Sequence, residues 1–224
     1  MIAADQPTIF PANVQVAISS VEDGSMKDGI DLMTPKAVRN REAFLTSFSM
    51  SPQKAAVFFA SFETDDYCVY EDAVSGLIPG VDGVATNRAN VPILLPLADC
   101  VGAVVYDPAQ HALMVSHLGR HSTEQDGGAK TIVHMTERYG SQPDNLLVWL
   151  GPSPNGTDYP LWAFNNRSFI DVLTEQLCAA GVKRRNVEIS HVDTTVSPHY
   201  FSHSQHLKGL QEVDGRYAIV AMLK

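Results

Sequence analysis

The chain has 224 residues, of which 45% are hydrophobic and 18% charged, and its formal net charge is −9. Enough apolar side chains are present for a folded domain with a core, which excludes a disordered chain. The negative charge argues against a nucleic-acid or anionic-membrane partner. A small anionic substrate bound in a locally basic pocket remains compatible with it. We expect one domain over residues 1–224.

The cysteine content indicates a reducing compartment. Cys68, Cys100 and Cys178 are widely spaced and odd in number, which does not suit a disulfide framework. No apolar run reaches the length of a membrane span, and the first residues lack the pattern of a signal peptide. We therefore expect a cytoplasmic location and no membrane partner. The oligomeric state is not indicated by the sequence.

Apolar runs and turn residues predict strands alternating with helices. The helix that starts after Thr34 has a good N-cap residue and Pro35 at its first position. Residues 76–90 contain Pro-Gly and Asp-Gly turn signals, and Asp82 is interpreted as a structural turn residue, with lining of a cleft as the alternative. The sequence thus predicts an α/β (α+β) domain of mixed sheets flanked by helices. The strands are expected at 13–20, 55–60, 67–71, 92–106, 111–117, 145–150, 187–192 and 217–223, and two further helices at 129–139 and 162–180.

The stretch from Pro92 to Arg120 holds the main functional candidates. It is interpreted as two apolar strands joined by a turn at Asp107-Pro108-Ala109-Gln110. A two-residue loop at Pro108 and Ala109 would place Cys100 directly opposite His117, with Cβ atoms roughly 4.5–5.5 Å apart. A thiol and an imidazole at that range can share a proton or a metal ion. Asp99 interrupts the apolar run beside the cysteine, which is costly unless the acid has a role.

Several short segments resemble the YfiH-like laccase-domain family, of which this chain would be a divergent member. The resemblance implies the YfiH-like fold and a zinc-dependent site acting on purine nucleosides. Phosphate as nucleophile would give a phosphorylase, and water would give an adenosine deaminase. Cys100 and His117 would be zinc ligands, Asp99 a group that supports the ligands or acts as an acid or base, and Arg120 an anion contact. The matching segments are Ala98-Asp99-Cys100, His117-Leu118-Gly119-Arg120, Gly151-Pro152-Ser153, Phe201-Ser202 and Gly215-Arg216.

The chain departs from the family pattern at positions that matter for the chemistry. The family's third ligand is a histidine, whereas residues 61–66 contain none, so Glu63 or Asp65 is the nearest substitute, unless both acids simply solvate a loop. The family's Trp before Arg120 is missing, and its Tyr-Arg-Arg is here 203–205, His-Ser-Gln. Copper is less expected than zinc, because the His-x-His clusters of multicopper oxidases are absent.

Three hypotheses therefore remain open. The first is a zinc site formed by Cys100, His117 and one carboxylate. The second is a metal-free enzyme, a Cys–His hydrolase, in which Cys100 is the nucleophile and His117 its base. The third is a degenerate member that binds a ligand without turnover. A separate group of four histidines, at positions 191, 199, 203 and 206, is a further, less favoured candidate for a second metal site.

Overall fold

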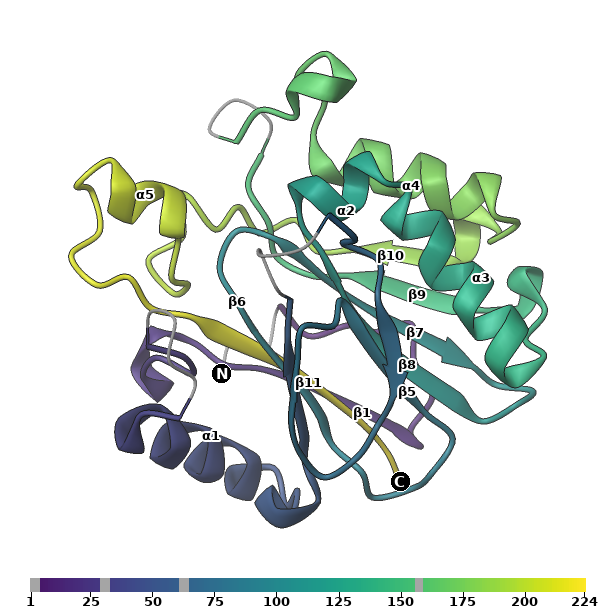
Figure 1. Ribbon diagram of the computed structural model, residues 1–224, viewed down its shortest axis with the longest axis horizontal. Coiled ribbons are helices and arrows are strands. Elements are labelled where there is room, and N and C mark those ends of the chain that lie inside the picture. Colours follow the sequence, from purple (N-terminus) through teal and green to yellow (C-terminus); the bar gives the residue numbers. More distant parts are fainter. Residues whose placement is uncertain (1–4, 29–32, 61–64, 156–158) are drawn as a thin grey trace.

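The computed structural model describes residues 5–28, 33–60, 65–155 and 159–224, and in them two mixed β-sheets pack face to face (Figure 1). The first sheet has five strands in the order β1-β11-β6-β2-β4, and the second has six in the order β10-β9-β7-β8-β5-β3. The expected α+β domain with mixed sheets and flanking helices is confirmed. Among the described residues, no helix combines the length and the apolar character needed to cross a membrane.

The elements of each sheet and the helices have the following bounds. The five-stranded sheet contains β1 (Val14–Ile18), β2 (Ala56–Phe59), β4 (Gly76–Pro79), β6 (Ile93–Leu97) and β11 (Tyr217–Leu223). The six-stranded sheet contains β3 (Tyr70–Asp72), β5 (Gly83–Thr86), β7 (Val101–Asp107), β8 (Ala112–Leu118), β9 (Leu147–Leu150) and β10 (Val187–Ile189). The α-helices are α1 (Pro35–Ser47), α2 (Arg120–Glu124), α3 (Gly127–Tyr139), α4 (Phe169–Ala179) and α5 (His203–Leu207).

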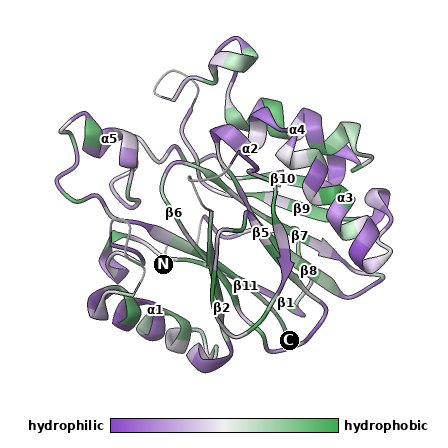
Figure 2. Cartoon of the chain, viewed as in Figure 1, coloured by the Kyte–Doolittle hydropathy of each residue, from purple (hydrophilic) through white to green (hydrophobic). Residues whose placement is uncertain are grey.

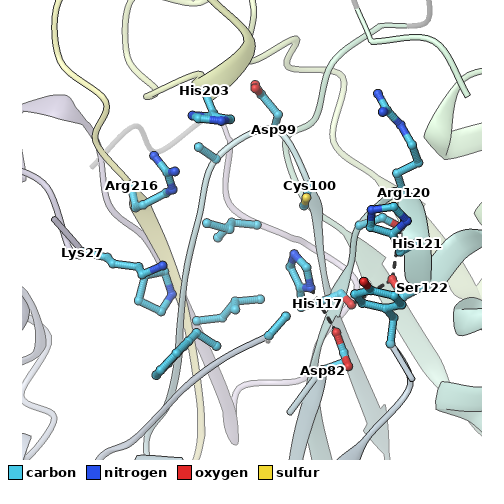
Figure 3. Close-up of a pocket in the computed structure, with 18 of the residues that line it drawn as sticks. Lys27, Asp82, Asp99, Cys100, His117, Arg120, His121, Ser122, His203 and Arg216 are labelled. Carbon is cyan, nitrogen blue, oxygen red and sulfur yellow. Dashed lines mark hydrogen bonds and ion pairs between the residues drawn. The ribbon is translucent and has the colours of Figure 1, made fainter. Parts of the chain in front are cut away.

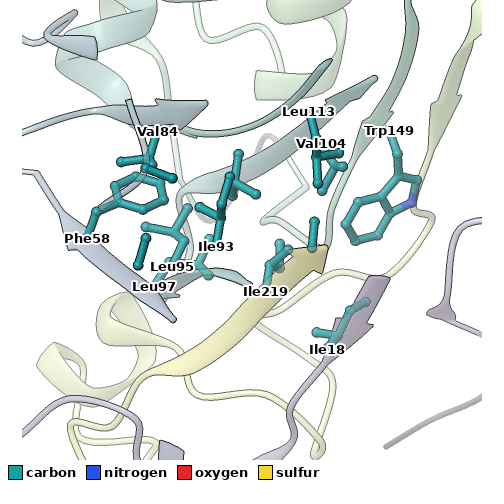
Figure 4. Packing of buried hydrophobic residues seen from close by; sticks show 14 of the residues in the cluster. Ile18, Phe58, Val84, Ile93, Leu95, Leu97, Val104, Leu113, Trp149 and Ile219 are labelled. Atoms are coloured by element: carbon teal, nitrogen blue, oxygen red, sulfur yellow. The ribbon is translucent and has the colours of Figure 1, made fainter. Parts of the chain in front are cut away.

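Three apolar layers hold the sheets and helices together. Helix α1 packs on the outer face of the five-stranded sheet, and α3 and α4 pack on the outer face of the six-stranded sheet. The third and largest layer lies between the two sheets and includes Phe58, Leu95, Trp149 and Ile219 (Figure 4). Figure 2 shows hydrophobic residues concentrated on the strands, while the helices carry hydrophilic residues as well. Burial of this apolar surface is the main force that holds the fold together.

The two-residue period of the central strands decides which side chains enter each layer. In β11, Tyr217 and Ile219 face the layer between the sheets, whereas Ala218 and Val220 face α1. In β7, Val104 faces the layer between the sheets, and its neighbours in sequence face α3 and α4. The strands are therefore buried on both faces, which explains their near-continuous apolar sequences.

The apolar run from Pro92 to Tyr106 does not form the single strand that the sequence predicts. It forms β6 in one sheet and β7 in the other, and the chain crosses between the sheets at Ala98-Asp99-Cys100. Asp99 makes this change of direction with φ of 69°, a left-handed conformation that aspartate tolerates better than most residues. The expected functional triplet is therefore the junction of the two sheets.

One further prediction of secondary structure is wrong, and two strands were missed. Residues 76–90 contain the short strands β4 and β5, which their turn residues hid. The helix expected over 162–180 is a short 3-10 turn at Trp162–Phe164 followed by α4. Asn165 and Asn166 separate them with positive φ, and Ser168 then caps α4 by accepting a hydrogen bond from the Asp171 backbone N–H. By contrast, the predicted Thr34 cap of α1 is confirmed, since its side chain accepts from the Ala37 N–H.

Candidate active site

Strands β7 and β8 pair in a register two residues away from the predicted one. The connecting loop has four residues rather than two, so His117 lies opposite Gly102 and Val101 lies opposite Leu118. Direct pairing of Cys100 with His117 is therefore wrong. A shift of two residues, however, keeps every side chain on its original face. Cys100 and His117 both point into the layer between the sheets, as diagonal neighbours.

The two side chains meet beside a glycine. The side chains of Cys100 and His117 are neighbours, close enough for the sulfur to raise the pKa of the imidazole. A Cβ atom at Gly119 would lie 3.1 Å from Cys100 Sγ and 3.0 Å from His117 Cε1. Both distances are tighter than ordinary van der Waals contact, so a larger residue at this position would push into the thiol–imidazole pair. The sequence-based expectation that the thiol and the imidazole share one site is thus compatible with the geometry.

Asp82 supports His117 from the side opposite to the cysteine, a role that the sequence analysis did not assign to it. It is buried, and its Oδ1 lies 3.5 Å from His117 Nδ1, while its carbonyl oxygen accepts the His117 backbone N–H at 2.6 Å. Burial alone would lower the pKa of His117, but the charges of Cys100 and Asp82 raise it to about 10. A carboxylate on the second ring nitrogen fixes the orientation of the imidazole.

These residues form one wall of a pocket of about 340 Å³ at the junction of the two sheets (Figure 3). A pocket of this size suits a small-molecule ligand. Lys27, Arg216 and His203 lie on the opposite side of the pocket from Cys100 and His117 (Figure 3). This side of the pocket is therefore basic, although the chain as a whole is negatively charged.

Asp99 lines the pocket but uses its carboxylate to hold the chain around it. One oxygen accepts the Thr194 hydroxyl at 3.0 Å, and the other accepts the backbone N–H of Ser204 at 2.7 Å. Ser204 lies in the first turn of α5, where backbone N–H groups have no partner within the helix. These contacts describe a positioning role for this buried acid. Its role as an acid or base in catalysis stays a prediction.

Arg120 lies at the edge of the pocket between two aromatic rings. Its guanidinium carbon is 4.7 Å from the ring centre of Tyr159 and 4.5 Å from that of Trp162. The Tyr159 side chain also lies near Cys100, whose charge, together with burial, raises the pKa of Tyr159. The sequence analysis missed Tyr159, because nothing in the surrounding residues indicates that this loop returns to the cysteine. The role of Arg120 as an anion contact stays a prediction.

The donors for a metal ion are only partly supplied by the described residues. Cys100 and His117 are two donors of the type that zinc prefers, and Asp82 orients the imidazole as in many zinc sites. Asp65 is exposed, and Glu63 lies outside the described residues. Over 5–28, 33–60, 65–155 and 159–224, no group of three His, Cys, Asp or Glu side chains could hold a metal ion. The donor chemistry fits zinc, and the identity of a third ligand stays a prediction.

The four histidines near the C-terminus do not gather at one place. His203 lines the pocket and its Nδ1 lies 2.9 Å from Asp214 Oδ1, whereas His206 Nδ1 bonds the carbonyl oxygen of Gln211. His191 and His199 are exposed. None of the four belongs to a metal-binding group of three among the described residues, so a second metal site is not supported.

Comparison with known proteins gives the relationship of this chain. Residues 33–224 match the family described as "Multi-copper polyphenol oxidoreductase laccase". The chain belongs to this laccase-domain family. Solved structures share the fold: YlmD from Geobacillus stearothermophilus superposes with a TM-score of 0.81, at 17% identity over 95% of this chain and 93% of that one. The Bacillus licheniformis hypothetical protein YfiH gives a TM-score of 0.78, at 18% identity over 94% and 93%.

Curated relatives of this laccase-domain protein carry a common name. A purine nucleoside phosphorylase, YlmD of Bacillus subtilis, is 35% identical over 37% of this chain and 30% of its own length. Purine nucleoside phosphorylases of Bacteroides thetaiotaomicron and Corynebacterium glutamicum are 23% and 25% identical, over 53% and 56% of this chain. These alignments span 46% and 51% of those relatives, so the chain aligns with about half of their length or less.

Proposed function

We propose that this laccase-domain protein is a purine nucleoside phosphorylase whose reactive centre is the Cys100–His117 pair. The observation that carries the proposal is that these two side chains meet in a pocket whose other side is cationic. The relatives named purine nucleoside phosphorylase support the choice of substrate. A nucleoside and phosphate together need a pocket that accepts both an uncharged ring system and an anion.

Phosphorolysis forms one bond at the ribose and breaks another. A phosphate oxygen forms a bond to C1′ of the ribose, the bond from C1′ to the purine nitrogen breaks, and the base leaves with that electron pair and takes up a proton. The task of the protein is to bring the phosphate and C1′ together and to stabilise the charge that develops. Cationic side chains hold the phosphate, and Asp82 keeps the imidazole of His117 in a fixed orientation toward Cys100.

Zinc is part of this proposal, with Cys100 and His117 as two of its ligands. Glu63, which lies outside the described residues, is the proposed third, because among those residues Asp65 belongs to no metal-binding group of three. When bound there, zinc would supply Lewis-acid stabilisation of negative charge. We expect protein purified without chelator to contain about one zinc ion per chain, measured by elemental analysis. Replacing either Cys100 or His117 by alanine should remove the ion, whereas Cys178→Ala, on α4, should retain it. Equal zinc in Cys100→Ala and the unaltered protein would contradict this assignment.

The metal-free hypothesis has one observation in its favour. The described residues supply a thiol and an imidazole in contact but no complete set of three ligands. A cationic imidazole beside a sulfur favours the thiolate, which is the nucleophilic form of cysteine. Full activity in protein that carries no zinc would favour this mechanism over the first.

Substrate assays with and without phosphate test the proposed activity. Inosine and adenosine should each release the free base when phosphate is present, and neither should react appreciably without it. Ammonia released from adenosine independently of phosphate would instead indicate a deaminase. Binding of nucleosides with neither reaction would indicate the non-catalytic member that the departures from the family pattern leave open.

A further inference from the structure

We propose that Lys27, Arg216 and His203 form the subsite that binds inorganic phosphate, across the pocket from Cys100 and His117. This inference rests on the proposed function for the identity of the anion, and on the geometry for its place. The three residues come from distant parts of the chain: Lys27 follows β1, Arg216 immediately precedes β11, and His203 lies in the first turn of α5. Figure 3 shows them together on one side of the pocket.

Basic side chains gather at this place, and the two acids beside them, Asp99 and Asp214, are already engaged by protein groups. Arg216 Nη1 donates to Asp214 Oδ1 at 2.6 Å, and the same oxygen lies 2.9 Å from His203 Nδ1. One carboxylate therefore serves two basic groups, and Lys27 has no ion pair with any described residue. Burial and the positive charge of Arg216 lower the pKa of Lys27. A bound anion would relieve this crowding of like charges.

The same side chains also offer hydrogen-bond donors to an anion. The side-chain hydrogen bonds of Arg216 to described residues use Nη1, which donates to Asp214 and also to the Gly215 carbonyl oxygen at 2.8 Å. Its side chain is 16% exposed, so the guanidinium is held in place rather than free in solvent. Lys27 Nζ lies 5.5 Å from the ring centre of Phe59, which also lines the pocket. Fixed guanidinium and ammonium donors are the groups that recognise phosphate.

This place suits phosphate better than the neighbourhood of Arg120, the anion contact predicted from the sequence. The guanidinium of Arg120 is already packed between two aromatic rings. Asp99 lies beside the proposed subsite, and its carboxylate already accepts hydrogen bonds from Thr194 and from the backbone N–H of Ser204, the residue after His203. A phosphate held by Lys27 and Arg216 would face Cys100 and His117 across the pocket, which leaves the space between them for the ribose.

The test is calorimetric titration of the full chain with inorganic phosphate, alone and in the presence of a free purine base, with which phosphate cannot react in the forward direction. Lys27→Gln should weaken phosphate binding by about ten- to a hundredfold, because one charge-assisted hydrogen bond is lost. Lys27→Arg should retain most of the affinity. Lys36→Gln is the matched control, since Lys36 is an exposed residue of α1 and its replacement removes the same charge.

Steady-state kinetics separate this inference from the proposed function. Lys27→Gln should raise the KM for phosphate more than the KM for the nucleoside. Phosphate affinity unchanged in Lys27→Gln, or absent in the unaltered protein, would overturn the subsite. Phosphate binding that depends on Lys27 in a protein that cleaves no nucleoside would uphold the subsite and refute the proposed function. Nucleoside cleavage with a phosphate KM that does not change in Lys27→Gln would refute the subsite and uphold the proposed function.

Discussion

Replacing Cys100 by alanine is expected to lower kcat/KM for phosphorolysis of a purine nucleoside by about 10³-fold or more. Losses of this size are typical when a group central to the chemistry is removed. The thiol contacts both His117 and Tyr159, so its loss removes the shared partner of two pocket side chains. Loss of the thiol would lower the rate whether the sulfur binds zinc or attacks as a nucleophile. The measurement is release of free base at saturating phosphate.

Cys178→Ala provides the matched control for this variant. Cys178 is a half-buried cysteine on α4, away from the residues that line the pocket. We expect its replacement to leave kcat/KM near the value of the unaltered protein. Turnover that survives Cys100→Ala, in protein with an unchanged circular dichroism spectrum, would refute both catalytic proposals for the cysteine.

Replacing Trp149 by alanine is expected to lower the free energy of unfolding by about 3–5 kcal/mol. Trp149 is 1% exposed and fills the layer between the two sheets (Figure 4). No neighbouring strand can collapse fully into the space of an indole, because both sheets are held by their hydrogen bonds. Chemical denaturation followed by far-ultraviolet circular dichroism measures the change without relying on tryptophan fluorescence.

Trp162→Ala removes the other tryptophan and serves as its control. The Trp162 side chain is 67% exposed and stacks on Arg120 at the edge of the pocket. We expect it to cost less than about 1 kcal/mol. Equal losses in the two variants would show that the layer between the sheets is not the packed core described above.

The sequence predicted the strands well where their apolar runs were long. The terminal strand was expected at 217–223, which are the bounds of β11, and the α1 cap was identified from Thr34 and Pro35. Short strands were missed or shifted, because β4 and β5 have four residues each and adjoin turn signals. A run that is buried on both faces carries no mark of where it passes from one sheet to the next. The break at Asp99 was visible, but its meaning as a crossover was not.

The candidate site was predicted in part. Cys100 and His117 were placed on one face through an incorrect register, because the error was an even number of residues. Asp82 was interpreted as a turn residue, although it follows an apolar residue and precedes a buried strand. Lys27 and Tyr159 could not be joined to the site by any local pattern, and Arg216 fell in a family-like segment without a role, since each reaches the pocket through long-range packing. Such residues are found only once the strand order is known.

The central claim is that this pocket joins phosphate to the ribose of a purine nucleoside. Its most direct test is incubation of the unaltered protein with inosine and phosphate labelled with ¹⁸O at every oxygen, followed by mass spectrometry of the sugar product. We predict ribose 1-phosphate that retains every label, because the attacking oxygen comes from phosphate and its bonds to phosphorus remain intact. Free unlabelled ribose, or no sugar product at all, would contradict the account.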